Sequence, residues 1–264
     1  VFLDAPGGKI SNTGTLIAKG TDPARAAGVL INAAFAKVDG QIRASHEDGS
    51  GGEIRISATD LASVGGTLDA SGSENAGGSV IVEGSTVEVG SGARIDVSGS
   101  EGGQVFLGGG FQGQDSTITN AATTTVEAGG LIIADGTGDG EAGRGVVWAD
   151  QRTEFRGEIR SEASGSGDGG FVEVSGKNSL LFDGIVSTLS SGGGRTGTLL
   201  LDPTNFTITP GAGASTVNSI GSTTLISMLG TNNVIIATDT LGTEEGDITV
   251  AAGATVTWNN ANAL

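Results

Sequence analysis

The sequence predicts an all-β protein: a parallel β-helix, or solenoid, with about 25–27 residues per coil, followed by a partial second β module with one short helix. Glycine accounts for 49 of 264 residues and proline for only 4, which excludes a collagen-like repeat and favours many tight corners. Short β-branched and aliphatic bursts follow these glycines at a nearly constant interval. That interval is too short for a four-stranded propeller blade, and the repeats lack the amphipathic helices of a βαβ unit.

Two independent markers set the period. One is a burst that begins at residues 29, 53, 79, 104, 146, 171 and 198, as VLIN, EIRI, SVIV, QVFL, VVWA, FVEV and TLLL. The other is the glycine before a second burst, at Gly14, Gly40, Gly66, Gly92, Gly130, Gly157 and Gly184. Both markers lengthen once, between residues 92 and 146. Stacked at ~4.8 Å per coil, about ten coils would form a rod ~50 Å long.

Alternation within each burst predicts which side chains face inward, because successive strand residues point to opposite sides. Three columns are expected in the core: Ile54, Val80, Val105, Val147, Val172 and Leu199; Ile56, Val82, Leu107, Ala149, Val174 and Leu201; and Leu16, Ile42, Leu68, Ile95, Ile159 and Val186. Asn32 falls in the second column, which indicates either an internal asparagine or a slip of register. Corners such as SGSENAGG, SGSEGG and SGSGDGG are expected to use glycine for its access to positive φ.

The outward positions of the first burst change from polar to apolar along the chain. They begin with Glu53, Arg55 and Ser79 and continue as Ile81, Phe106, Val146, Trp148, Phe171 and Leu200. An exposed stripe of Phe106, Trp148 and Phe171 would be a contact surface, because large apolar patches on a soluble protein have a cause. The alternative is that the extra residues within 108–145 fold back and cover this face.

The repeat ends after GTLLLDPTNFTITPG, residues 197–211. The sequence therefore predicts a shaft over residues 1–201 and the start of a second, truncated β-rich module over 202–264. In the second module, Ser222 is expected to cap a short helix that Gly230 ends. Strands are expected at NFTI, NVIIAT, DITVAA and ATVTW.

Catalytic chemistry has little support in this sequence. His46 is the only histidine and is expected in an exposed corner loop, without a nucleophile motif nearby. A polysaccharide lyase or hydrolase needs carboxylates at a defined separation, whereas the acidic residues here are scattered through corners. We therefore expect a protein that is not an enzyme and requires no cofactor.

Calcium is the one cofactor that the residues suggest. The loop ADGTGDGEAG brings Asp135, Asp139 and Glu141 close together in sequence, and hard cations prefer carboxylate and carbonyl oxygens. The spacing matches neither an EF-hand loop nor the calcium-binding nonapeptide repeat, so a solvated acidic loop is the alternative.

Charge and cysteine content narrow the classes of partner. The net charge of −17 disfavours binding to nucleic acid or an anionic membrane. The absence of cysteine excludes disulfides and thiolate metal sites. Neither a signal peptide nor a long apolar run is present, and the first residue is Val1, so we expect a segment of a longer protein.

Three stretches of the chain resemble a known family. They are VFLDAPGGKISNTGTLIAKG, the region from GGGFQGQDSTITN to SLLFDG within residues 108–184, and GTLLLDPTNFTI. These stretches look like the filamentous-haemagglutinin-type exoproteins of two-partner secretion. The resemblance implies a right-handed β-helix fibre in a very large, secreted surface protein of a Gram-negative bacterium.

The resemblance also implies partners and a role. An outer-membrane β-barrel transporter would export the chain, and the folded rod would act as a structural and adhesive shaft in attachment, biofilm or fibre formation. The family's Asn-Pro secretion motifs are missing here, so we expect the transporter contact to lie elsewhere. The resemblance does not identify the receptor, and it leaves self-association into fibres as a further alternative. The alternative functions are a carbohydrate- or matrix-binding module and a polysaccharide lyase or hydrolase.

Overall fold

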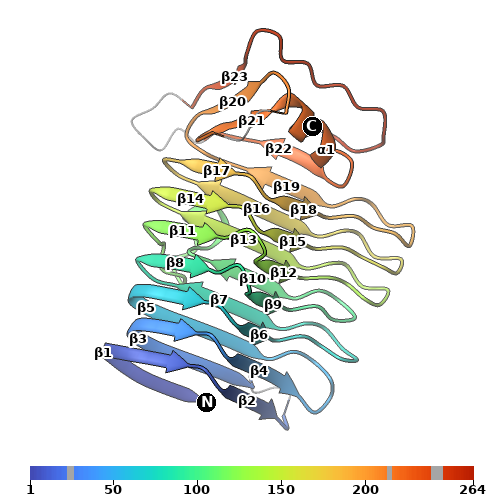
Figure 1. Cartoon of the computed structure of the whole chain (residues 1–264). Helices are drawn as coiled ribbons and strands as arrows, with labels where there is room; N and C mark the ends of the chain where they lie inside the picture. Colours follow the sequence, from blue (N-terminus) through green and yellow to red (C-terminus); the bar gives the residue numbers. More distant parts are fainter. Residues whose placement is uncertain (23–26, 213–215, 239–245) are drawn as a thin grey trace.

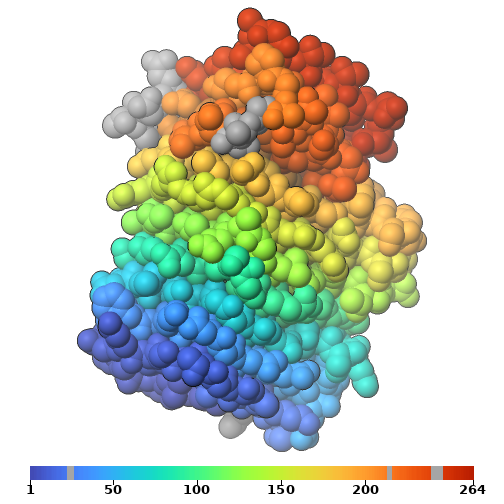
Figure 2. Space-filling view, viewed as in Figure 1, coloured from blue at the N-terminus to red at the C-terminus, as the bar shows by residue number. Residues whose placement is uncertain are grey.

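The computed structural model describes residues 1–22, 27–212, 216–238 and 246–264. The chain winds into a parallel β-solenoid of about seven turns, and each coil lies directly on its predecessor (Figure 1). In the space-filling view the colours follow one another in parallel bands from the N-terminus upward (Figure 2). The expected all-β solenoid with one short helix is confirmed.

Each coil contributes strands to three faces, as the three bursts per period predict. The first face consists of β1 (Phe2–Asn12), β3 (Gly28–Val38), β5 (Glu53–Val64), β7 (Ser79–Glu83), β10 (Gln104–Leu107), β13 (Arg144–Ala149), β16 (Phe171–Gly176), β19 (Thr198–Leu201) and β22 (Asn233–Ile236). The second face consists of the far halves of β1, β3 and β5, with β8 (Thr86–Val89), β11 (Thr123–Val126), β14 (Arg152–Phe155) and β17 (Leu180–Phe182). The third face consists of β2 (Thr15–Gly20), β4 (Gln41–His46), β6 (Thr67–Asp69), β9 (Arg94–Asp96), β12 (Leu131–Ile133), β15 (Glu158–Arg160) and β18 (Ile185–Ser187).

The expectation of about ten coils is wrong, because the described chain makes about seven turns. One coil is much longer than the others: Gln104 pairs with Arg144, which is 40 residues further along the chain. The residues after β19 also leave the solenoid instead of making regular coils. At ~4.8 Å per coil, seven turns rise by about 34 Å.

The core is a set of straight aliphatic columns. On the third face, Leu16, Ile42, Leu68, Ile95, Ile159 and Val186 stack as predicted, with Ile132 between Ile95 and Ile159. Ile31 pairs with Ile56 and is fully buried, so Asn32 points outward beside Ser57. A slip of register therefore explains Asn32. Each such aliphatic side chain contributes roughly 1.5–3 kcal/mol by its burial.

The predicted register of β13 is wrong by two residues. Val105 pairs with Gly145 and Leu107 pairs with Val147, so Val147 belongs to the column of Ile56. Ala149 pairs with Gly176 and lies beyond the two predicted columns. Gly145 occupies an inward position but has no apolar side chain. The alternation of apolar residues in the sequence therefore begins at Val147, two residues too late.

The second face carries buried aromatic and hydroxyl side chains. Phe155 and Phe182 stack with ring centroids 5.5 Å apart. Thr124 and Thr153 are fully buried in the same core, and each hydroxyl donates a 2.7 Å hydrogen bond to a backbone carbonyl, of Trp148 and of Ser175 respectively. The hydroxyls are therefore satisfied, which removes the cost of burying a polar group.

The glycines of one corner are needed for close packing and not for positive φ. A column of glycines, Gly52, Gly78, Gly103, Gly143, Gly170 and Gly197, runs along one corner. None of the six has a positive φ. A Cβ at Gly103 would lie 2.1 Å from the carbonyl oxygen of Gly78, and the other members show the same conflict with the preceding coil. The expected use of positive φ is thus wrong for this glycine column.

Residues after β19 pack onto the last coil. β20 (Phe206–Thr209), β21 (Ser219–Gly221) and β23 (Ile248–Val250) form a small sheet beside the helix α1 (Ser222–Met228), and β22 returns to pair with β19. The apolar side chains of this region belong to the same buried cluster as the coils. No helix within the described ranges has the length and apolar character of a transmembrane span.

The start of α1 differs from expectation. Gly221 is the N-cap, and no side chain caps the helix. The Ser222 hydroxyl instead accepts a 3.2 Å hydrogen bond from the backbone N–H of Gly211. The segment ATVTW, residues 254–258, forms no strand.

Candidate functional site: the covered face and the corner groove

The extra residues of the long coil fold back over the first face. Residues 108–120, here called the cover segment, leave the end of β10 and include the short 3₁₀ turn η1 (Phe111–Gly113). Gly113 has a φ of +62°, and a Cβ there would lie 2.5 Å from the Trp148 ring. Glycine at this position therefore lets the backbone lie directly against the indole.

Trp148 is buried under the cover segment, so the expectation of an exposed tryptophan is wrong. Its side chain is 5% exposed, and its Nε1–H donates to Asp150 at 3.1 Å. Val146 and Leu200 are buried on the same face. The alternative prediction, that part of 108–145 covers this face, is the one that the structure shows.

Phe106, Trp148 and Phe171 do not form one stripe. Phe106 lies in a column with Ile81 and Val146, whereas Phe171 pairs with Arg144. Trp148 pairs with Ser175, in a third column. Phe106 and Phe171 are half-buried. The three side chains thus lie on the same face of the solenoid but in three different columns, so they form no continuous exposed patch. The reason is that the register of β13 differs from the predicted one.

A buried carboxylate anchors the C-terminal part of the cover segment. Glu83 accepts hydrogen bonds from Arg55 Nε at 2.9 Å and from the backbone N–H of Thr119 at 2.8 Å. Arg55 also donates to the carbonyl of Thr117 at 2.7 Å. Glu83 is 5% exposed, and its pairing with Arg55 offsets the cost of burying its charge.

Two further carboxylates lie beneath the 3₁₀ turn. The backbone N–H of Gln112 donates to both carboxylate oxygens of Glu173, at 3.2 and 3.1 Å. The Gln112 side-chain amide donates to Asp202 at 2.8 Å. Burial raises the pKa of Glu173 to about 7, and the charge of Asp202 acts in the same direction. These carboxylates hold the cover segment over positions that are 61 and 90 residues away in sequence.

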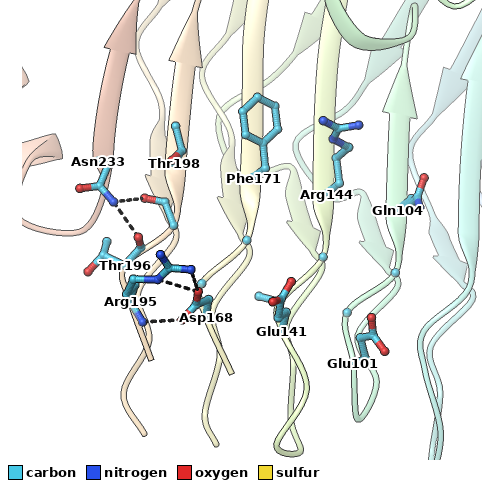
Figure 3. A pocket seen from close by; sticks show the side chains of 17 residues that line it. Glu101, Gln104, Glu141, Arg144, Asp168, Phe171, Arg195, Thr196, Thr198 and Asn233 are labelled. Carbon is cyan, nitrogen blue, oxygen red and sulfur yellow. Dashed lines mark hydrogen bonds and ion pairs between the residues drawn. The ribbon is translucent and has the colours of Figure 1, made fainter. Parts of the chain in front are cut away.

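An open groove of about 620 Å³ runs along the neighbouring corner, crossing several coils (Figure 3). We call it the corner groove. Its floor is the backbone of the glycine column and the adjacent small residues. One wall is a row of strand residues, Gln104, Arg144, Phe171, Thr198 and Asn233. The other wall consists of the loops that carry Glu101, Glu141, Asp168 and Arg195.

The groove has a repeating local sequence. Each coil supplies a charged residue, two small residues and then the wall residue of the next strand, as EGGQ, EAGR, DGGF and RTGT at residues 101–104, 141–144, 168–171 and 195–198. Because the coils stack in register, these four units lie side by side (Figure 3). The repeated units can be seen in the sequence, but only the correct register of β13 shows that they lie side by side in one groove.

Arg144 packs against two aromatic rings that contact each other. Its guanidinium carbon lies 5.1 Å from the Phe111 ring centroid and 4.9 Å from that of Phe171. The two rings meet edge to face at 5.8 Å. Arg144 makes no hydrogen bond or ion pair with any residue in the described ranges. Its N–H donors are therefore fixed in place by stacking yet unused.

Arg195 and Asp168 form a charged pair in the groove. Nε and one terminal nitrogen of Arg195 donate to the same carboxylate oxygen, at 2.9 and 2.7 Å. The pKa of Asp168 is lowered by these bonds and that of Arg195 is raised. The pair is solvent-exposed, so its contribution to stability is small.

The predicted calcium ligands are not brought together. Asp135 accepts hydrogen bonds from Arg160 at 2.5 Å and from the backbone of Glu162 at 2.9 Å. Asp139 accepts from the backbone and hydroxyl of Ser166 in the next coil. Glu141 lies in the corner groove. Within the described ranges, no three acidic, histidine or cysteine side chains are placed to hold a metal ion.

His46 is buried, contrary to the expected exposed loop position. It ends β4, is 8% exposed, and its Nε2 accepts a 3.2 Å hydrogen bond from the backbone N–H of Ala27. A Cβ at Gly20 would lie 2.7 Å from its ring. The histidine therefore holds the backbone of Ala27, directly before β3, in place.

One solved structure similar to this chain is the secretion domain of HMW1 from Haemophilus influenzae, with a TM-score of 0.60 and 32% sequence identity. The similarity covers 72% of this chain and 49% of the HMW1 domain, so the chain spans about half the length of that structure. No protein-family profile matches the chain, and no curated protein sequence matches it.

Proposed function

We propose that this chain is a structural and adhesive shaft segment of a very large exoprotein of two-partner secretion, located on the outer surface of a Gram-negative bacterium. The similarity to the HMW1 secretion domain is the observation that carries the proposal. The stacked coils support it, because a solenoid in which each coil contacts only its neighbours extends into a stiff rod. The absence of cysteine also suits export as an unfolded chain.

The shaft acts by display and not by catalysis in this proposal. An outer-membrane β-barrel transporter exports the chain, which folds outside from coil to coil, and the rod then holds binding surfaces away from the cell. No cofactor is required. Incubation with acidic and neutral polysaccharides should release no product, and the appearance of new reducing ends would favour the lyase or hydrolase alternative.

A second candidate follows from the same similarity, since the HMW1 structure is itself a secretion domain. In that case this chain would contact the transporter directly. The carbohydrate- or matrix-binding alternative is the third candidate.

An in-frame deletion of residues 1–264 from the full-length protein, expressed with its transporter, separates the first two candidates. For a shaft segment, we expect the shortened protein to reach the medium in undiminished amount, while attachment of the bacteria to cells or matrix falls. Loss of export would instead support the secretion-domain candidate. Unchanged attachment with normal export would contradict the adhesive shaft.

A further inference from the structure

The corner groove carries hydrogen-bonding groups that the fold does not use. Glu101, Gln104 and Glu141 are exposed, and none of them uses its side chain in a hydrogen bond with another described residue. Arg144 packs against Phe111 and Phe171 and likewise makes no hydrogen bond or ion pair within the described chain. Figure 3 shows Gln104 and Arg144 in one row on neighbouring strands, and Glu101 and Glu141 in a second row on the loops that precede those strands. Unused donors and acceptors thus lie on two neighbouring coils, ~4.8 Å apart.

The balance of charge excludes a polyanion as the preferred occupant. Asp168 is neutralised by Arg195, which leaves Glu101 and Glu141 against Arg144, a net excess of negative charge. The charge of Arg144 also acts on the buried carboxyl of Glu173. The whole chain adds to this field with its net charge of −17. An uncharged ligand can bond to both walls if its groups accept hydrogen bonds from the Arg144 guanidinium and donate hydrogen bonds to the carboxylates of Glu101 and Glu141. Hydroxyl groups do both.

The shape of the groove favours a long ligand. It is open to solvent and crosses four coils, and its floor lies low because glycine there has no side chain. A floor of this kind cannot be raised by substitution, since a Cβ at Gly143 would lie 2.0 Å from the carbonyl oxygen of Gly103. An open groove that crosses four coils fits an extended polymer better than a compact ligand.

We propose that the corner groove binds an uncharged polysaccharide laid along the solenoid axis, with sugar hydroxyls accepting from Arg144 and donating to Glu101 and Glu141. The stacked Phe171 and Arg144 side chains form the rigid part of this surface. The inference rests on the proposed adhesive function and names the class of ligand that one surface of the shaft would recognise.

Affinity electrophoresis of the purified chain in gels that contain a defined polysaccharide tests the proposal. The uncharged probes are mixed-linkage β-glucan, galactomannan and dextran, and the polyanionic probes are polygalacturonate and heparin, all at about 0.15 M salt to limit long-range electrostatics. We expect at least one uncharged polysaccharide to retard the protein, and neither polyanion to do so.

Two variants assign the binding to the groove. Arg144→Lys keeps the positive charge but loses the planar fork, and the double substitution Glu101→Gln with Glu141→Gln keeps the shape but removes two carboxylates. Each should weaken retardation about tenfold, the effect of losing one strong hydrogen bond. Glu88→Gln, an exposed glutamate on β8 of another face, is the control and should bind like wild type. Thermal melting checks that all variants fold.

Three results would overturn the proposal: no retardation by any uncharged polysaccharide, stronger retardation by a polyanion, or equal retardation of wild type and both groove variants. None of these results affects the outcome of the deletion experiment on bacterial attachment. A shaft that adheres through another surface would show no polysaccharide binding by the groove, yet its deletion would still reduce attachment.

Discussion

Glu173 shows how the cover segment places a charge where water cannot reach it. Its carboxyl is fully buried beneath Gln112 and close to the charge of Asp202, and its pKa is raised to about 7. A carboxyl with a raised pKa binds a proton more tightly in the folded than in the unfolded protein. Its stabilising contribution is therefore complete below the ordinary pKa of about 4.5 and is lost as pH rises through about 7.

Replacing Glu173 with Gln should remove this pH dependence, because the amide keeps an acceptor for Gln112 and carries no charge. We expect the variant and the wild type to have similar free energies of unfolding near pH 4. Near pH 8 the variant should be more stable by about 3 kcal/mol, the order expected for this shift in pKa. Urea unfolding at the two pH values measures the difference. A variant that is equally or less stable at pH 8 would show that the buried carboxylate of Glu173 does not destabilise the folded protein.

Single residues also show where the sequence was sufficient and where it was not. The aliphatic columns could be predicted, because alternation reports directly which side of a strand is buried. Gly145 broke that signal in β13, since an inward glycine has no apolar side chain to reveal its position. The burial of His46 could not be predicted, because its partner is a backbone N–H 19 residues earlier in the chain.

At the scale of the element, the glycine column sets how closely the coils approach at one corner. Substituting Gly103 with Ala would place a Cβ 2.1 Å from the carbonyl oxygen of Gly78 and 2.9 Å from the backbone of Gly77. Backbone must move to relieve these contacts, so we expect the free energy of unfolding to fall by at least about 3 kcal/mol. Chemical denaturation measures the loss.

Gly14→Ala is the matched control. A Cβ at Gly14 has no neighbour within 4 Å, and its φ is not positive. We expect this substitution to be neutral or to stabilise by about 0.4–1 kcal/mol, because alanine has less freedom in the unfolded chain. Equal effects of the two substitutions would contradict the close approach of the coils at the glycine column.

The cover segment was only partly predictable for a related reason. The lengthened interval in the sequence showed that extra residues exist, and the apolar outward positions showed that a face needs covering. The contacts that fix the segment join Gln112 to Glu173 and Asp202, far along the chain. Those contacts depend on the stacking of the four coils that contain β10, β13, β16 and β19, and a local sequence pattern does not reveal that stacking. The corner groove was missed because its units align only in the correct register.

At the scale of the whole molecule, charge opposes folding. The net charge of −17 is spread over a compact rod, and its self-repulsion is greater in the folded than in the expanded state. Salt screens this repulsion and also weakens the surface ion pairs, but each exposed pair contributes only about 0–1 kcal/mol. We therefore expect the melting temperature to rise by about 2–5 °C between low salt and about 0.2 M sodium chloride. A fall would mean that ion pairs dominate.

The same titration tests calcium. Since Asp135, Asp139 and Glu141 are not gathered around one point, calcium and magnesium chloride at equal ionic strength should raise the melting temperature equally. An extra rise that is specific to calcium and removed by chelator would restore the calcium site predicted from the sequence.

The central claim is that each coil lies on its predecessor, in the stated register, even across the long insertion. A disulfide between cysteines introduced at Glu88 and Thr125 tests it most directly. These residues are paired neighbours on β8 and β11, on opposite sides of the cover segment in sequence, and the chain has no cysteine of its own. Their Cα atoms should lie ~4.8 Å apart, within the range of a disulfide.

Glu88→Cys with Thr123→Cys is the control, because Thr123 is on the same strand and face but two residues out of register, at ~8 Å. Mild oxidation should close the Glu88/Thr125 pair almost completely, as read from the loss of free thiol and from the mobility on a non-reducing gel, and should leave the Glu88/Thr123 pair largely open. Preferential closure of the shifted pair, or of neither pair, would contradict the stacked solenoid and the functions that depend on it.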